Sequence, residues 1–317
     1  MHVAIVGGGP GGLYLAILLK KSDPTRTVRV IEQNRADDTF GFGVVFSDAT
    51  LGNIEVADPQ TYEAITAHFA HWDDIDVHYA GQCLRSTGHG FAGLSRKRLL
   101  QLLQIRCEEL GVSLEYETHI DGVADLSDAD MIVAADGLNS AIRTELSEHF
   151  EPKVDHRPNR FTWLGTRRQF PAFTFYFKEN EHGLWRVHAY NFEDGLSTFI
   201  VETTEAAWRA SGMDRATEEE TARYCEALFA HELEGYPLLI NRSIWRQFPT
   251  VSNRQWYHDN VVLLGDSAHT AHFSIGSGTK LAMEDAIALS SALDCETGLK
   301  DAFAKYQEER KPNVDST

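Results

Sequence analysis

The sequence predicts an α/β fold: a three-layer domain built on a parallel sheet, with an antiparallel β-sheet inserted into it. Three observations predict this fold. Buried strand-like segments alternate with helical ones near both ends of the chain, as parallel sheets require. Turns containing glycine follow three of those strands. Between them, residues 161–202 hold strand-like runs separated by turn residues, which is typical of antiparallel hairpins.

The first element pair forms a β-α-β unit. Val3–Val6 reads as a short buried strand, Leu13–Lys21 as a helix, and Val28–Ile31 as a second strand. A parallel pair of strands needs such a crossover helix. The first 32 residues therefore predict the start of a Rossmann-like domain.

A glycine motif joins the first strand to the first helix. In Gly7-x-Gly9-x-x-Gly12 the glycines suit a tight turn, close approach of a pyrophosphate, and close helix–strand packing. Pro10 and Gly11 open the helix, whose free N–H groups and dipole attract phosphate. Glu32 ends the second strand, where an acid accepts ribose hydroxyls. The motif predicts dinucleotide binding; the alternative is a glycine-rich turn without a ligand.

Two later strands each end in an aspartate. Met131–Ala135 leads into Asp136-Gly137, and Val261–Leu264 leads into Gly265-Asp266. Two such strand ends exceed what NAD needs and suit a longer ligand that carries hydroxyl groups. They favour FAD over NAD.

The remaining elements divide the chain into two predicted domains. Residues 1–150 and 250–317 form the FAD-binding domain, and residues 151–249 form the substrate domain. The further predicted helices span Ser95–Glu109, Glu218–Glu232, Ala282–Leu293 and Asp301–Arg310, and the further predicted strands span Phe173–Phe177, Trp185–Tyr190 and Ser197–Val201.

Composition narrows the classes of partner. Lys and Arg total 29 and Asp and Glu total 47, giving a net charge of −18, which disfavours nucleic acid but permits a local anion site. The four cysteines form no C-x-x-C pair, so the sequence predicts no metal site, and free thiols suit the cytoplasm. No signal peptide and no membrane span are expected.

The three motifs together resemble the class A, FAD-dependent aromatic monooxygenases. This family carries G-x-G-x-x-G, D-G and G-D segments in this order, and the resemblance covers essentially the whole chain. It implies bound FAD, NAD(P)H as the reductant, and O₂ as the oxygen donor. The segments 190–202 and 272–280 look like the salicylyl-CoA 5-hydroxylase and 2-aminobenzoyl-CoA monooxygenase group. Many relatives continue beyond the position of Lys311-Pro312, so we expect this chain to be part of a longer protein.

The resemblance assigns residues to the flavin. Asp266 would bind the ribityl hydroxyls; the alternative is a helix cap. Gly276, Gly278 and Thr279 would open a helix facing the flavin pyrimidine edge, where N–H groups stabilise negative charge. The alternative is an ordinary glycine-rich helix start.

Further cofactor residues follow from the same resemblance. Asp136 would lie near FAD or guide the reductant, unless it is only a turn residue. Arg96 would pair with the pyrophosphate, unless it is a solvated charge. Gly43 and Val44 would line the isoalloxazine ring, unless they form a flexible turn.

Three side chains are candidates for orienting the aromatic substrate. His188, Tyr190 and His272 could hold the ring oxygen or nitrogen, and histidine titrates near neutral pH. His272 is the first choice because it lies between the G-D aspartate and the flavin-facing helix. The alternative for His188 and Tyr190 is that they only pack within the strand predicted over 185–190.

A basic run interrupts the acidic sequence. Arg157, Arg160, Arg167 and Arg168 suit phosphate oxygens, so they are candidates for binding CoA. The alternative is surface charge. The expected activity is hydroxylation of an aryl-CoA thioester such as salicylyl-CoA at position 5. Alternatives are a hydroxylase of an indole-type natural product, a non-catalytic nucleotide-binding module and an NAD dehydrogenase. The oligomeric state is not predicted.

Overall fold

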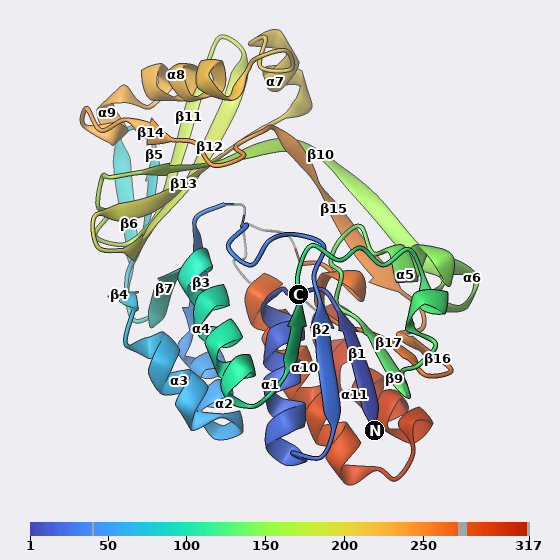
Figure 1. Ribbon diagram of the computed structural model, residues 1–317. Coiled ribbons are helices and arrows are strands. Elements are labelled where there is room, and N and C mark those ends of the chain that lie inside the picture. The colour runs from blue at the N-terminus through green and yellow to red at the C-terminus, as the bar shows by residue number, and fades with distance from the viewer. Residues whose placement is uncertain (40, 272–277, 316–317) are drawn as a thin grey trace.

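The computed structural model describes residues 1–39, 41–271 and 278–315. Its first sheet has six strands in the order β16-β17-β9-β1-β2-β8, all parallel except β16. Their bounds are β1 (His2–Val6), β2 (Thr27–Ile31), β8 (Ser113–Glu115), β9 (Met131–Ala134), β16 (Tyr257–His258) and β17 (Val261–Leu263). The predicted parallel sheet is confirmed, and its strands come from both ends of the chain (Figure 1).

Helices pack against this sheet and against one another. α1 contacts β2, α4 and α10, which explains why every residue from Pro10 to Leu19 is buried. The helices of this part are α1 (Pro10–Ser22), α2 (Asp48–Ala57), α3 (Pro59–Thr66), α4 (Arg96–Glu109), α5 (Ala141–Glu145), α6 (Ser147–Phe150), α10 (Gly278–Cys295) and α11 (Leu299–Asp315), with 3₁₀ turns η1 (Val123–Leu126) and η2 (Gly265–Ser267).

The second sheet is mainly antiparallel and lies above the first in Figure 1. Its order is β14-β10-β13-β12-β11-β5-β6, with β15 also paired to β10. The bounds are β5 (Ile75–Tyr79), β6 (Gln82–Ser86), β10 (Pro152–Thr166), β11 (Phe173–Asn180), β12 (Gly183–Glu193), β13 (Leu196–Thr203), β14 (Leu238–Leu239) and β15 (Arg246–Asn253). The predicted inserted sheet is confirmed, and helices α7 (Glu205–Ala210), α8 (Glu218–Leu228) and α9 (Ala230–Leu233) cover its outer face.

A small sheet connects the two large ones. It consists of β3 (Gly43–Ser47), β7 (Phe91–Ser95) and β4 (Ala70–Trp72). Trp72 stacks on Tyr190 of β12 with ring centroids 5.9 Å apart. Aromatic packing therefore fixes β4, one edge of the small sheet, against the antiparallel sheet.

Two expectations differ in detail from the structure. The helix predicted over 218–232 is interrupted at Phe229, which caps α8 and leaves α9 as a separate turn. The hairpin β5–β6 falls within the predicted first domain, yet it pairs with β11 of the antiparallel sheet. The domain boundaries stay a prediction. Among the described helices, none combines the length and apolarity needed to cross a membrane.

Candidate functional site

The site is a cleft of about 770 Å³ at the carboxyl ends of the parallel strands. Strand registers align Val6 with Ile31 and with Ala134, and Ala134 with Leu263, so the turns after four strands meet at one edge. Ligands of such sheets bind at this edge. Every cofactor candidate that the structure describes lines this cleft: Gly7, Gly9, Pro10, Gly11, Gly12, Glu32, Gly43, Val44, Arg96, Asp136, Gly265, Asp266, Gly278 and Thr279.

The three motif glycines differ in what surrounds them. Gly7 has φ +113°, and a Cβ there would overlap the Ala135 carbonyl. A Cβ on Gly12 would overlap the carbonyl oxygen of Gly7. Gly9 has no atom within 4 Å of the place where its Cβ would lie. Gly7 and Gly12 thus serve the turn and the packing, whereas Gly9 faces open space in front of the α1 N-terminus.

Glu32 is held at the end of β2 by backbone hydrogen bonds. Its Oε2 accepts from the Gly8 N–H at 2.8 Å, and its Oε1 accepts from the Asn34 N–H at 2.8 Å. Asn34 Nδ2 also donates to Oε1, at 2.6 Å. A carboxylate offers about four lone-pair sites, so about one remains for a ribose hydroxyl. Ribose binding by Glu32 stays a prediction, and the position of the side chain is compatible with it.

Asp136 lies two residues after β9 and also accepts a hydrogen bond from the first residue of α5, whose N-cap is Ser140. Its Oδ2 accepts from the Ala141 N–H at 2.8 Å, while its Oδ1 is buried without a hydrogen-bond partner among the described residues. Burial raises the pKa of Asp136 above its ordinary value, against the hydrogen bonds it accepts. A buried acceptor without a partner is costly unless a ligand supplies a donor.

Asp266 and Arg96 both line the cleft, and their opposite charges influence each other. Asp266 follows Gly265, whose φ of +65° turns the chain after β17. The surrounding protein raises the pKa of Asp266, while the positive charges of His269 and Arg96 oppose that rise. Burial lowers the pKa of Arg96, and the negative charge of Asp266 opposes that change. The two groups place opposite charges where a phosphate and a hydroxylated chain would lie.

These residues fit FAD. Gly9 leaves room for phosphate oxygens at a helix N-terminus, and Asp136 lacks a donor that a ligand can provide. The volume is in the range of cofactor clefts. Gly278 and Thr279 at the start of α10 also line the cleft, and Ala282 in the first turns of α10 packs against Gly11 of α1.

An aromatic wall closes the cleft on the side of the antiparallel sheet. Phe161 and Trp163 of β10, Phe173 of β11, and His188 and Tyr190 of β12 all line it. The Trp163 Nε1 is buried without an acceptor among the described residues. Phe161, Trp163 and Phe173 were not recognised from the sequence, although the alternation of Phe161 and Trp163 along one strand was a usable signal.

The two described substrate candidates are placed differently. The Tyr190 hydroxyl donates to the Gly43 carbonyl at 2.9 Å, and burial raises the pKa of Tyr190 above its ordinary value. His188 Nε2 lies 3.7 Å from Glu202 Oε2 and lines the cleft. Burial works to raise the pKa of Glu202, but hydrogen bonds from His188 and Asn159 and the charge of Arg186 hold it below the ordinary value. His272 and Gly276 lie outside the described residues.

The predicted CoA-binding arginines do not line the cleft. Arg168 is paired with Glu234 at 2.6 Å and Arg160 lies 4.6 Å above the Trp208 ring, so both are engaged within the substrate domain. Arg157 and Arg167 are exposed. Three exposed arginines that the sequence did not single out line the cleft instead: Arg35, and at the rim Arg242 and Arg246.

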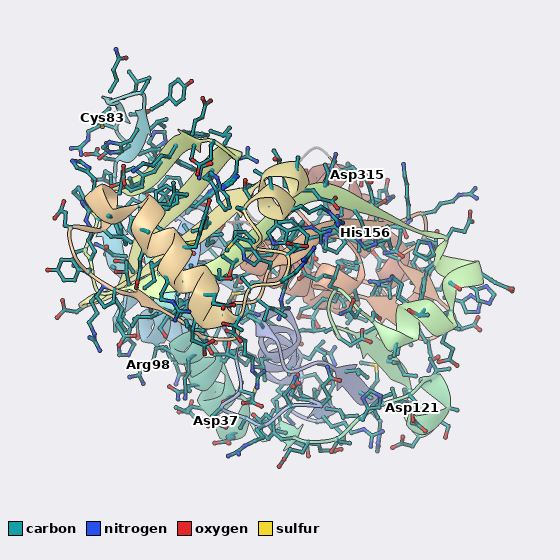
Figure 2. All side chains as sticks on the ribbon, turned by 90° about the horizontal axis from the view of Figure 1, so that it is seen from above. Asp37, Cys83, Arg98, Asp121, His156 and Asp315 are labelled. Carbon is teal, nitrogen blue, oxygen red and sulfur yellow. The ribbon has the colours of Figure 1, made fainter. Side chains whose placement is uncertain are left out.

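One cluster lies away from this cleft. The sequence predicted no metal site because no C-x-x-C pair exists. The structure nevertheless brings donor atoms of Asp76, His78 and Cys83 within 4.8 Å of one another. Figure 2 shows Cys83 at the periphery of the molecule.

Comparison with known proteins identifies the family. The model of the FAD binding domain matches residues 1–317. The chain is 45% identical to a salicyloyl-CoA 5-hydroxylase of a Streptomyces species over 99% of its length, and it spans 63% of that relative. It is 35% identical to a 3-hydroxy-4-methyl-anthranilyl-[aryl-carrier protein] 5-monooxygenase of Streptosporangium sibiricum, covering 100% of this chain and 86% of the relative. It is 32% identical to the protodeoxyviolaceinate monooxygenase of Chromobacterium violaceum, covering 99% and 85%.

Solved structures show the same fold. 2-Methyl-3-hydroxypyridine-5-carboxylic acid oxygenase superimposes with a TM-score of 0.81 at 19% identity, covering 99% of this chain and 88% of that one. PqsL of P. aeruginosa, in complex with 2-aminobenzoylacetate, gives 0.76 at 23% identity, covering 100% and 94%. With the motif residues gathered at one cleft and the family model matching throughout, this chain belongs to the class A FAD-dependent monooxygenases.

Proposed function

We propose that this enzyme hydroxylates the ring of an aromatic acid held as a thioester, with salicylyl-CoA and its 5-position as the first candidate. The observation that carries the proposal is the combination of an aromatic wall inside the cleft with Arg242 and Arg246 at its rim. An aryl ring suits the wall and a phosphate-bearing arm suits exposed guanidinium groups. The relative at 45% identity, of which this chain spans 63%, supports the same substrate class.

The residues of the chain would divide the work between the two sides of the cleft. FAD, when bound and reduced by NAD(P)H, supplies the activation of O₂ for attack on an electron-rich ring. Gly9, Arg96 and Asp266 would hold its phosphates and hydroxyls on one side. On the other side, His188, braced by the buried Glu202, would accept a hydrogen bond from, or donate one to, the ring substituent. The aromatic wall excludes water, which protects the oxidising chemistry.

A second candidate is a hydroxylase of a natural-product precursor. Relatives at 35% and 32% identity act, by their names, on a carrier-bound anthranilyl group and on protodeoxyviolaceinate. The carrier-bound ring still needs an arm at the rim, whereas the indole-type substrate would not use the arginines. The same cleft could therefore hold either class of substrate. The two candidate functions differ in whether Arg242 and Arg246 take part in binding.

The decisive experiment compares how substrates stimulate NAD(P)H oxidation by the FAD-loaded chain. Salicylyl-CoA, free salicylate, a carrier-bound anthranilate and an indole-type acid are tested at equal concentrations, and hydroxylated products are identified. We expect stimulation and product with the CoA thioester and little with free salicylate. Equal rates with the free acid, or product only with the indole-type acid, would contradict the proposal.

A further inference from the structure

The hairpin β5–β6 carries a group of side chains that the flavin site does not use. β6 ends the antiparallel sheet, and all of its residues are exposed. Asp76, His78 and Cys83 do not line the FAD cleft. We infer that these three residues form a binding site for a divalent transition-metal ion, with Zn²⁺ as the preferred occupant.

Strand register places the three side chains on one face. Asp76 and His78 are two residues apart on β5, so both point to the same side of the sheet. Cys83 of β6 is the direct partner of His78. The hairpin turn consists of Ala80 and Gly81, with φ of +49° and +76°, which is the type I′ geometry that fixes register in two-residue hairpins. The pairing of Cys83 with His78 is therefore set by the backbone.

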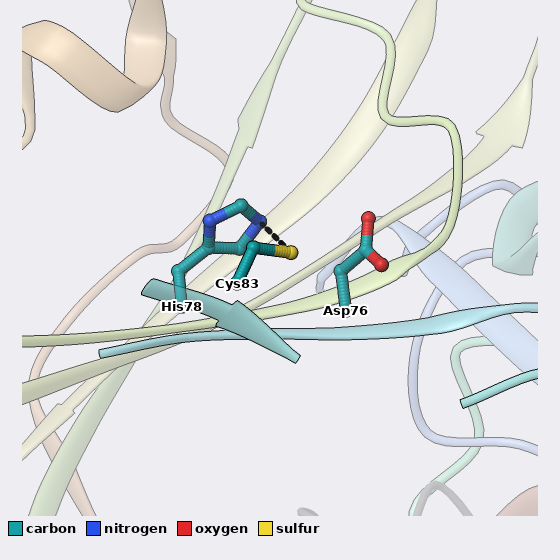
Figure 3. Close-up of side chains that lie close together, drawn as sticks. All are labelled: Asp76, His78 and Cys83. Atoms are coloured by element: carbon teal, nitrogen blue, oxygen red, sulfur yellow. Dashed lines mark hydrogen bonds between the residues drawn. The ribbon is translucent and has the colours of Figure 1, made fainter. Parts of the chain in front are cut away.

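The spacing of the donor atoms suits zinc. Cys83 Sγ and His78 Nε2 are 3.6 Å apart, as the dashed line in Figure 3 marks. Zn–S and Zn–N bonds of about 2.3 and 2.0–2.1 Å at a tetrahedral angle put the two ligand atoms about 3.5 Å apart. Sulfur and imidazole are also the ligands that Zn²⁺ prefers. A carboxylate oxygen of Asp76 within 4.8 Å needs only a small shift to complete three ligands.

Arg85 affects the proposed metal site in two ways: its positive charge opposes a cation, but its hydrogen bonds orient the ligand Asp76. Its Nε and a terminal nitrogen donate to the two oxygens of Asp76 at 2.7 and 2.6 Å, which brings a positive charge near the site. Asp74 lies 3.3 Å from Arg85 and offsets that charge. The fork uses one lone pair on each oxygen of Asp76, and a carboxylate has about four such sites. Arg85 thus orients Asp76 in the way that outer-sphere partners orient metal ligands.

The charge of the cluster also favours a cation. Asp74, Asp76 and Arg85 together carry one negative charge, and Zn²⁺ binding releases the proton of the Cys83 thiol to solvent. A water molecule supplies the fourth ligand. No oxidation or reduction is involved.

Metal titration tests the site on the FAD-loaded chain after chelator treatment. Zn²⁺ is titrated in competition with a chromogenic chelator. We expect one equivalent to bind, with affinity reduced at least about 100-fold in Cys83→Ser and in His78→Gln, because loss of a ligand exceeds the effect of losing an outer partner. Cys295→Ser removes the other exposed cysteine and is the matched control, expected to bind like the unmodified chain. Equal affinity in Cys83→Ser and the unmodified chain would overturn the site.

A second measurement needs no substitution. Alkylation of each cysteine is followed by peptide mass analysis with and without Zn²⁺. We expect Zn²⁺ to slow alkylation of Cys83 at least tenfold and to leave Cys295 unchanged. Co²⁺ should give a thiolate-to-metal absorption band that Cys83→Ser lacks. Unchanged alkylation of Cys83 at saturating Zn²⁺, or no such band, would overturn the proposal even if a variant failed to fold.

Discussion

The imidazole Nε2 of His269 lies 2.6 Å from Oδ2 of Asp285, and the same carboxylate accepts from Arg310 through its other oxygen at 2.7 Å. Oδ2 of Asp285 also accepts from the Gly265 N–H at 3.2 Å. The side chains of His269, Asp285 and Arg310 are all buried. The turn that carries Asp266 is thus fastened to α10 and α11 through one buried carboxylate.

Asp285→Asn should destabilise the protein strongly. The substitution removes the fully buried charged partner of Arg310 and of His269 and leaves Arg310 only the longer contact with Glu284, and breaking a buried pair costs about 3–5 kcal/mol. Urea unfolding of the FAD-loaded chain measures the change. Glu284→Gln is the control, since Glu284 also faces Arg310, at 3.3 Å, but is less buried and should cost about 1 kcal/mol or less. Equal losses in the two variants would contradict a special role for Asp285.

Asp285 should also contribute to loss of stability in acid. Burial works to raise its pKa, but the charges and hydrogen bonds of His269 and Arg310 hold the pKa below the ordinary value. The folded state therefore binds the proton less readily than the unfolded chain, so this stabilisation is present above about pH 4 and declines as the pH falls through the folded pKa. Unfolding free energies at pH 7 and pH 3 measure it. The difference between the unmodified chain and Asp285→Asn should narrow at pH 3.

Short-range patterns predicted the flavin side of the site, but of the opposite side they predicted only His188 and Tyr190. Gly9, Asp136 and Asp266 lie two or three residues after strands, so local sequence and the rule that parallel strands end together were sufficient to place them. Arg246 could not be placed in this way, because β15 reaches the cleft only through its pairing with β10, more than 80 residues earlier in the chain. Likewise, Arg168 lies in a basic run, but its partner Glu234 comes from the distant end of α9.

Gly9→Ala and Gly12→Ala should separate cofactor binding from folding. Gly9 has φ −75° and ψ 174°, which alanine adopts freely, and its Cβ would enter only the space meant for the ligand. We expect the free energy of unfolding of the FAD-free Gly9→Ala chain to change by less than about 0.5 kcal/mol. Its affinity for FAD should be at least about tenfold weaker. Gly12→Ala should instead cost about 1–3 kcal/mol by overpacking. Flavin fluorescence and urea unfolding measure both; unaltered FAD affinity in Gly9→Ala would refute this assignment.

Tyr190→Phe should affect stability more than chemistry. Burial raises the pKa of Tyr190, so the hydroxyl stays protonated at working pH and donates to the Gly43 carbonyl rather than acting as a base. Loss of that hydrogen bond should cost about 0.5–1.5 kcal/mol. The pH profile of kcat should keep its shape. Tyr176→Phe, which loses a contact with Arg168 outside the cleft, is the matched control; a shifted profile in Tyr190→Phe alone would make Tyr190 a catalytic residue after all.

Arg242→Ala and Arg246→Ala should weaken binding of the thioester arm and leave ring chemistry intact. A charge-assisted hydrogen bond to phosphate is worth about 1.5–3 kcal/mol, so KM for an aryl-CoA should rise about tenfold or more at unchanged kcat. KM for a free aromatic acid should not change. Arg157→Ala and Arg167→Ala remove exposed arginines that do not line the cleft, and they test the competing placement of the CoA phosphate. A rise in KM confined to these two variants would move the binding surface away from the rim and onto the basic run of residues 157–168.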